Sequence, residues 1–218
     1  GFNQNGNYLT VQLKQHQNFG PSQIRLQVVS DKIIRVQATA EQSFRNKQSL
    51  IIVPQNSKAN YKVEEQGDNL IITTAAMRAV MNEATGQITF YDLKDNVLLN
   101  EVAQGGKTFK PFTVPDREIG VDIAKVPEAQ KHGWSWRALF NSPDNEAFYG
   151  LGQHQSEELN MKGKNEDLFQ YNTKVSVPFV ISNKNYGILW DSYSYCRWGN
   201  PEDYLQLNRA FKLYDKDG

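Results

Sequence analysis

The sequence predicts an all-β protein, a large two-sheet antiparallel β-sandwich with few or no helices. Apolar and polar residues alternate along most of the chain, which is the period of a strand with one buried face. Turn-forming Gly, Asn, Asp and Pro separate these short runs at spacings of roughly 8–12 residues, as in all-β domains. So many strands exceed what one open sheet holds, so we expect two packed sheets.

The expected strands form a series of hairpins in the first half of the chain. Gly, Asn or Asp at each reversal tolerates the backbone angles that tight turns need. These strands cover residues 8–13, 24–28, 33–38, 61–65, 70–74, 77–81, 87–92 and 97–102.

The second half of the chain is less regular. Residues 103–131 are rich in Gly, Lys, Pro and Glu and are expected to form irregular edge structure, and only 201–207 suits a short helical turn. Further strands are expected at residues 134–140, 147–151, 167–171, 174–181, 186–190 and 195–198.

Charge and composition exclude several classes of protein. Lys plus Arg and Asp plus Glu both number 24, so a nucleic-acid or anionic-membrane partner, which needs a basic surface, is not favoured. No run of 18 apolar residues exists, so no transmembrane segment is expected. The lone Cys196 excludes a disulfide framework and a cysteine-based zinc site.

We treat residues 1–218 as one domain, and we expect it to be a fragment. The chain starts at Gly1 and its last eight residues have the pattern of a strand entering a turn. A targeting signal would then lie upstream.

The three histidines show no metal-ligand spacing, so no metal or cofactor is expected. His16 and His132 lie in polar surroundings and are expected at the surface. His154 follows Gly150-Leu-Gly152-Gln and is a candidate to face a cleft, although a role in local structure is favoured. The two glycines of this motif predict positive φ or a close approach by another segment.

Two pairs of carboxylates lie in the long segment 154–172. Glu157 and Glu158 are near its start, and Glu166 and Asp167 are near its end. Adjacent carboxylates point in different directions, so a solvated loop is favoured over an acid–base pair. Sugar binding by one of them is more plausible, because charge-assisted hydrogen bonds hold hydroxyl groups well.

Other catalytic signatures are missing from the sequence. It has no Gly-x-Ser-x-Gly nucleophile elbow for acyl transfer, and Gly150-x-Gly152 lacks the third glycine of a dinucleotide site. Most of the dense aromatic residues after residue 168 are expected in the core, whereas Tyr171 and Trp198 are expected to face a ligand.

Four runs in the last third, residues 148–153, 159–173, 177–179 and 185–193, resemble the N-terminal domain of glycoside hydrolase family 31. Lys162-Gly-Lys164 and Gln170-x-Asn172-Thr173 are most similar to its bacterial α-xylosidases. Asn185 stands where the family usually has Gly, and Asn also accepts a left-handed φ.

The resemblance implies a galactose-mutarotase-like β-sandwich in a retaining α-glycosidase. It also implies that the two catalytic aspartates lie in a (β/α)₈ barrel after residue 218, so that none of the residues here is catalytic. The sandwich would pack on its own barrel and contribute a loop to the pocket for the oligosaccharide substrate. By position, the substrate-binding candidates in that loop are Asn165, Glu166, Asp167, Gln170 and Tyr171.

The leading functional hypothesis is release of α-linked xylose from xyloglucan oligosaccharides by the full-length enzyme, in the periplasm or outside the cell. An α-glucosidase of the same family is one alternative, and a free-standing carbohydrate-binding module is another. A mutarotase-like enzyme would need a His and a carboxylate in one cleft, which the scarcity of His disfavours.

Overall fold

The computed structural model describes residues 1–13, 18–45, 48–53, 59–113, 122–155, 158–170, 172–194 and 196–199. These ranges contain seventeen strands, a short 3-10 helix (Ile123–Lys125) and one four-residue α-helix, α1 (Glu128–Lys131). Neither helix is long or apolar enough to span a bilayer. The expectation of an all-β fold is confirmed.

The chain divides into two compact units. Unit 1 comprises Gly1–Lys110 and Ser135–Asp144, and unit 2 comprises Pro111–Trp134 and the chain from Asn145 onward.

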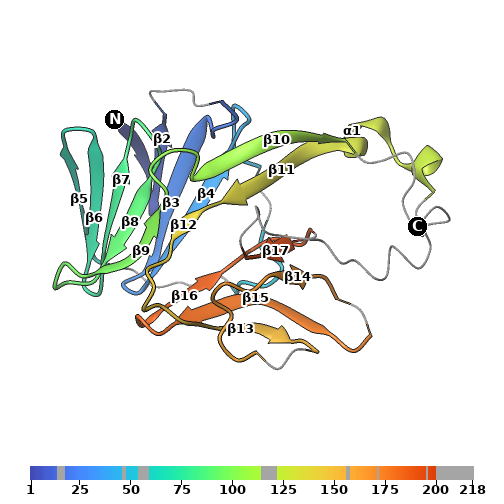
Figure 1. Cartoon of the computed structure of the whole chain (residues 1–218). Helices are drawn as coiled ribbons and strands as arrows, with labels where there is room; N and C mark the ends of the chain where they lie inside the picture. The colour runs from blue at the N-terminus through green and yellow to red at the C-terminus, as the bar shows by residue number, and fades with distance from the viewer. Residues whose placement is uncertain are drawn as a thin grey trace. The chain divides into compact units, whose positions relative to one another are not determined.

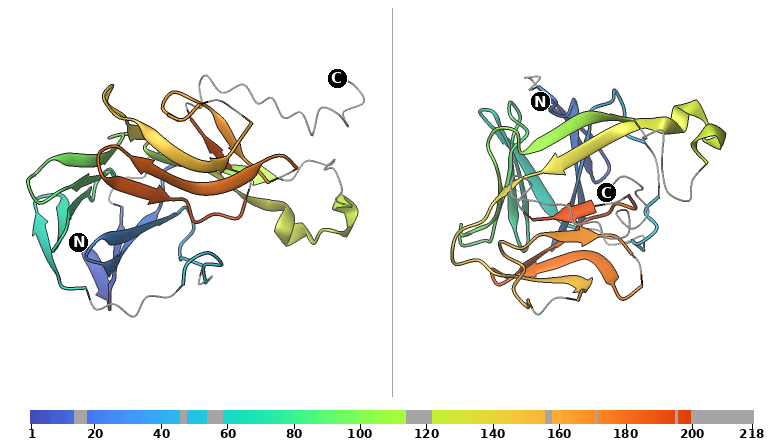
Figure 2. Two further views of the ribbon diagram at one scale, coloured as in Figure 1. Left: turned by 90° about the horizontal axis from the view of Figure 1, so that it is seen from below. Right: turned by 45° about the vertical axis from the view of Figure 1, so that its right-hand side comes forward.

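Unit 1 contains a four-stranded and a six-stranded antiparallel sheet (Figures 1 and 2). The first has β1 (Phe2–Asn5), β2 (Tyr8–Gln12), β3 (Gln23–Ser30) and β4 (Ile33–Thr39) in sequence order. The second runs in the order β12-β9-β8-β7-β6-β5, with β5 (Tyr61–Gln66), β6 (Asn69–Thr74), β7 (Arg78–Asn82), β8 (Ile88–Tyr91), β9 (Val97–Glu101) and β12 (Phe140–Asn141).

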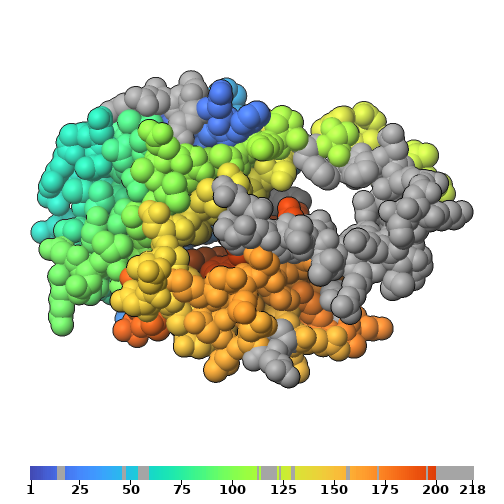
Figure 3. All heavy atoms as spheres, in the orientation of Figure 1, coloured from blue at the N-terminus to red at the C-terminus, as the bar shows by residue number. Residues whose placement is uncertain are grey.

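The alternation seen in the sequence places one face of each sheet in a shared core. Strand β3 buries Ile24 and Leu26, and β6 buries Leu70 and Ile72; all four belong to one apolar cluster. Each such side chain contributes roughly 1.5–3 kcal/mol on burial. Unit 1 is therefore a two-sheet sandwich. In Figure 3 the atoms of strands β5 to β9, coloured teal to green, form one contiguous group.

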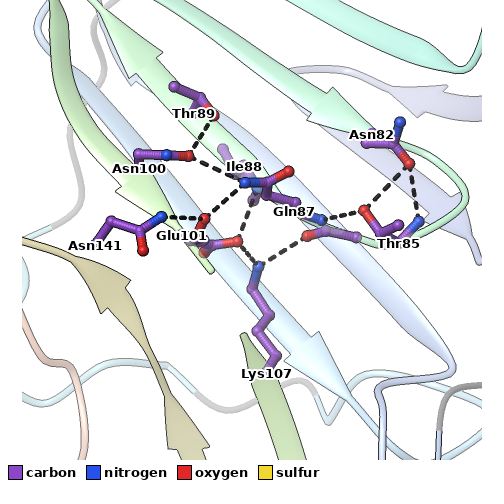
Figure 4. A network of polar contacts seen from close by, with 10 residues as sticks. Asn82, Thr85, Gln87, Ile88, Thr89, Asn100, Glu101, Lys107 and Asn141 are labelled. Atoms are coloured by element: carbon purple, nitrogen blue, oxygen red, sulfur yellow. Dashed lines mark hydrogen bonds and ion pairs between the residues drawn. The ribbon is translucent and has the colours of Figure 1, made fainter. Parts of the chain in front are cut away.

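A buried ion pair joins the end of strand β9 to the start of β10 (Lys107–Thr113), the next strand along the chain (Figure 4). Lys107 Nζ pairs with Glu101 Oε2 and also donates to the Gly86 carbonyl at 3.0 Å. The same carboxylate oxygen accepts from the Ile88 amide at 2.8 Å. Burial raises the pKa of Glu101 and lowers that of Lys107, and the attraction between them partly offsets both shifts.

The region 103–131 is more regular than its composition predicts. Strand β10 (Lys107–Thr113) pairs with β11 (His132–Ala138) in a two-stranded sheet, and Phe109 stacks on Trp136 with 5.8 Å between ring centroids. One end of this ribbon belongs to unit 1 and the other to unit 2. The sequence did not predict β10, because its buried lysine and its proline are atypical of strands.

Unit 2 contains a three-stranded sheet of β13 (Phe148–Gln153), β15 (Val175–Ser182) and β16 (Tyr186–Leu189), and a pair of short strands, β14 (Glu166–Leu168) and β17 (Cys196–Trp198). Its buried cluster is Phe148, Leu151, Met161 and Val180. The turn between β15 and β16 places Asn185 at φ +64°, which confirms the left-handed conformation expected there.

The two glycines of β13 lie at a bulge. The register with β15 shifts between Gly150 and Gly152, whose φ angles are +132° and +96°. A Cβ atom on Gly152 would lie 2.0 Å from the Val175 carbonyl oxygen, and one on Gly150 would lie 2.5 Å from that of Phe179. Both expectations for these glycines, positive φ and close approach, are confirmed.

We expect Lys107→Met to lower the free energy of unfolding by about 3–5 kcal/mol, because it leaves the buried Glu101 carboxylate unpaired. The double variant Glu101→Gln/Lys107→Met should recover much of that loss. Chemical denaturation of the 218-residue chain measures both, with the exposed Lys62→Met as the control, which should stay within about 0.5 kcal/mol of wild type. Equal losses in Lys107→Met and Lys62→Met would contradict the structural role of the pair.

Gly152→Ala should be far more disruptive than Gly163→Ala. Both glycines have positive φ, and a Cβ at Gly163 would meet nothing within 4 Å. The shared backbone strain costs about 1–2 kcal/mol, and the contact at Gly152 adds about 1–3 kcal/mol or prevents folding. Unfolding curves of the two variants test this difference, and similar curves would argue against the close approach of β13 and β15.

Candidate functional site

The segment 154–172 leaves strand β13 at His154, and a bond to the bulge fixes this residue. Its Nε2 lies 2.7 Å from the Leu151 carbonyl oxygen, where a ring N–H can donate. Its Nδ1 lies 2.8 Å from Glu166 Oε1, without the alignment of a hydrogen bond. With only 6% of its side chain exposed, His154 has the local structural role that the sequence favoured.

Glu166 begins strand β14 and faces two basic groups. Its Oε1 lies 2.8 Å from the ammonium of Lys174, and the ring of His154 lies beside the same oxygen. The Glu166 side chain is 16% exposed and that of Lys174 is 7% exposed. The Glu166 carboxylate is therefore held within unit 2 by its contacts with Lys174 and His154.

Gln170 closes the end of the segment onto strand β15. Its Oε1 accepts from the Ser176 amide at 3.0 Å, and its Nε2 donates to the Lys174 carbonyl. These bonds leave the Gln170 side chain exposed at the start of β15. The Gln170 amide therefore attaches the end of the loop to the backbone at the start of β15.

The other substrate-binding candidates lie in or next to β14. Asp167 is half-buried and lies opposite Arg197 in the pairing of β14 with β17. Asn165 is exposed, and its Oδ1 would lie 2.1 Å from a Cβ on Gly199. Tyr171 lies outside the described residues. The structure thus gathers Asn165, Glu166, Asp167 and Gln170 in one short stretch between two anchored ends.

Other predicted residues have different positions. Trp198, expected to face a ligand, is half-buried: its ring packs edge-to-face on Phe148, with 5.2 Å between centroids, and its Nε1 donates to the Met161 carbonyl at 3.3 Å. His132 is exposed as expected and lies 3.0 Å from Glu128. His16, Glu157 and the proposed helical turn at 201–207 lie outside the described residues.

Sequence reasoning missed two polar groups of unit 2. Lys174 gave no local signal, because its partner Glu166 lies eight positions earlier and the pairing arises from tertiary structure. Glu146 is buried and accepts from the hydroxyls of Ser182 and Tyr186, both at 2.6 Å. Burial, with the Glu146 carboxylate beside it, raises the pKa of Tyr186.

The chemistry available in this stretch is hydrogen bonding. Asn165, Asp167 and Gln170 carry donors and acceptors suited to sugar hydroxyls. Glu166 and Asp167 are neighbours in a strand, where successive side chains point to opposite faces, so they do not form an acid–base pair. No group of three or more His, Cys, Asp and Glu in the described ranges is placed to hold a metal ion.

One face of strand β15 is apolar and open. Val180 and Ser182 are buried in unit 2, whereas Val175, Val177, Phe179 and Ile181 alternate with the buried side and are between 38% and 50% exposed. Solvated sheet faces are normally polar. This face therefore has the composition of a surface that another part of a protein covers.

Comparisons with known proteins agree with the all-β architecture. Residues 23–198 match the family described as the glycosyl hydrolase 31 N-terminal galactose mutarotase-like domain. The crystal structure of a GH31 α-xylosidase from Xanthomonas citri is similar over 91% of this chain, with 36% identity and a TM-score of 0.77.

Two curated proteins are similar at lower identity. An α-xylosidase from Saccharolobus solfataricus is 25% identical over 80% of this chain, and an uncharacterized family 31 glucosidase from Pseudescherichia vulneris is 26% identical over 78%. This chain spans 23% and 32% of their lengths, and 20% of the Xanthomonas enzyme.

The matched range covers most of the chain and includes all the strands of unit 2. The chain belongs to glycoside hydrolase family 31, as its N-terminal galactose mutarotase-like domain.

Proposed function

We propose that this chain is the non-catalytic N-terminal domain of a retaining α-glycosidase that releases α-linked xylose from xyloglucan oligosaccharides. The observation that carries the proposal is the 36% identity to the α-xylosidase of Xanthomonas citri. In this proposal the loop around residues 165–172 contributes to the pocket for the terminal sugar, and the catalytic groups belong to a barrel domain elsewhere in the protein.

The placement of the carboxylates supports a non-catalytic role. Glycosidases need two carboxyl groups that flank the same glycosidic bond. In β14, Glu166 is engaged by Lys174 and His154, and Asp167 follows it on the opposite face. The role left to this stretch is to bind and orient a sugar through Asn165, Asp167 and Gln170.

The open apolar face of β15 supports a position inside a larger protein. Its four exposed side chains would bury their apolar surface against the barrel domain, at roughly 25 cal/mol per Å² covered. A free-standing domain would leave this surface in water, where it would favour aggregation. This argues for the multidomain enzyme over an independent carbohydrate-binding module.

An α-glucosidase of the same family remains a second candidate, favoured by the similarity to the glucosidase of Pseudescherichia vulneris. Xylose and glucose differ by one hydroxymethyl group. The residues that distinguish them lie in the proposed barrel, so the sandwich alone does not select between the two.

We expect the full-length protein to hydrolyse aryl α-xylosides faster than aryl α-glucosides, and the isolated 218-residue chain to hydrolyse neither. The comparison is made by release of the aryl alcohol at equal protein concentration. A higher kcat/KM on the glucoside would select the glucosidase alternative. Hydrolysis by the isolated chain would overturn the non-catalytic assignment, and measurable glycan affinity of that chain would favour a binding module.

In the full-length enzyme, Asp167→Ala should raise KM or lower kcat, with kcat/KM reduced on the order of tenfold, because a charged hydrogen bond to a sugar is worth roughly 1.5–3 kcal/mol. The melting temperature should stay close to that of wild type. Asp144→Ala, at an exposed turn residue of unit 1, is the matched control. Kinetics equal to those of the control would remove Asp167 from the pocket.

A further inference from the structure

We propose that Glu166 and Lys174 form a buried clasp that positions the sugar-facing residues of the loop, with His154 as its third member. This inference rests on the proposed function, because it assigns positions to residues of that pocket. It separates Glu166 from its neighbours: Glu166 holds the loop, whereas Asn165, Asp167 and Gln170 meet the sugar.

The first contact of the clasp compensates for the free energy that burial of the charged Lys174 costs. Lys174 directly precedes β15 and keeps only 7% of its side chain exposed. An ammonium removed from water needs a carboxylate nearby, and Glu166 Oε1 lies 2.8 Å away. The pair thereby ties the start of β14 to the start of β15 and closes the intervening residues into a short loop.

His154 connects this pair to strand β13. Its Nε2 is held by the Leu151 carbonyl within the glycine bulge, and its Nδ1 lies 2.8 Å from the same Glu166 oxygen. The bulge permits this arrangement, because Gly150 and Gly152 adopt positive φ where β13 approaches β15. Residues at the end of β13 and at the starts of β14 and β15 therefore meet at one carboxylate oxygen.

The orientation of the pocket residues follows from this fixed point. Because side chains alternate along a strand, holding Glu166 inward directs Asp167 to the other face of β14. Gln170 adds a second attachment, through the Lys174 carbonyl and the Ser176 amide. A loop held at both ends loses less freedom when sugar binds, so binding is stronger and the substrate is better oriented.

The same segment contains a natural control. Glu158 and Lys164 form an ion pair at 3.0 Å, but their side chains are 42% and 46% exposed. Exposed pairs of this kind contribute little. Comparing the buried pair with the exposed pair separates the effect of the clasp from the general effect of removing a charge.

The experiment uses the full-length enzyme with the variants Glu166→Gln, Lys174→Met and Lys174→Arg, and the control variants Glu158→Gln and Lys164→Met. Amide hydrogen exchange of residues 159–170 and kcat/KM on an aryl α-xyloside are measured for each. We expect Glu166→Gln and Lys174→Met to speed exchange at least tenfold and to lower kcat/KM about tenfold, mainly through KM. Lys174→Arg should restore part of both, and the controls should match wild type.

The outcomes separate the clasp from the proposed function. Inactivity of the wild-type enzyme on α-xylosides and α-glucosides would end the proposed function, while exchange would still report on the clasp. Unchanged exchange in Glu166→Gln would overturn the inference, and so would faster exchange with unchanged kcat/KM, because the pair would then only stabilise the fold. If Lys174→Met does not fold, Glu166→Gln, which keeps the shape of the side chain, decides the matter.

Discussion

A lysine that leaves water must find a carboxylate, and in each unit of this protein such a pair links strands that belong to different sheets. In unit 1, Lys107 at the start of β10 pairs with Glu101 at the end of β9. In unit 2, Lys174 reaches Glu166 at the entrance of β15. The apolar cores supply most of the stability, but they are non-directional. The buried ion pairs are directional contacts, and displacing either partner would leave a buried charge uncompensated.

Membership of family 31 gives these contacts a functional meaning. This chain spans less than a third of the length of those relatives, and in β14 the Glu166 carboxylate is paired with Lys174. Unit 2 has an apolar face on β15 and a polar loop anchored at both ends. Under the proposed function, the face would be covered by another domain and the loop would meet the sugar.

The sequence was informative where local physics decides the structure. The alternation at residues 24–28 and 33–38 predicted β3 and β4, and the Gly150-x-Gly152 spacing predicted a close backbone approach that the structure contains. It failed where tertiary partners decide. Strand β10 was missed because its lysine is buried only through Glu101, and the packing of Trp198 was missed because its partner Phe148 lies fifty positions earlier. The resemblance predicts a substrate-binding loop around residues 165–172, and that stays a prediction; its anchor at Lys174 follows from an ion pair that spacing does not reveal.

The glycine bulge has a consequence for how such enzymes diversify. Gly152 lets β13 approach β15 closely, and His154 bonds to the Leu151 carbonyl where the chain leaves β13. The start of the segment 154–172 is therefore held in place. The tip, near Gly163, lies in open space. Insertions and deletions there would change the exposed surface of unit 2 without disturbing the scaffold, so relatives could vary this surface through loop length alone.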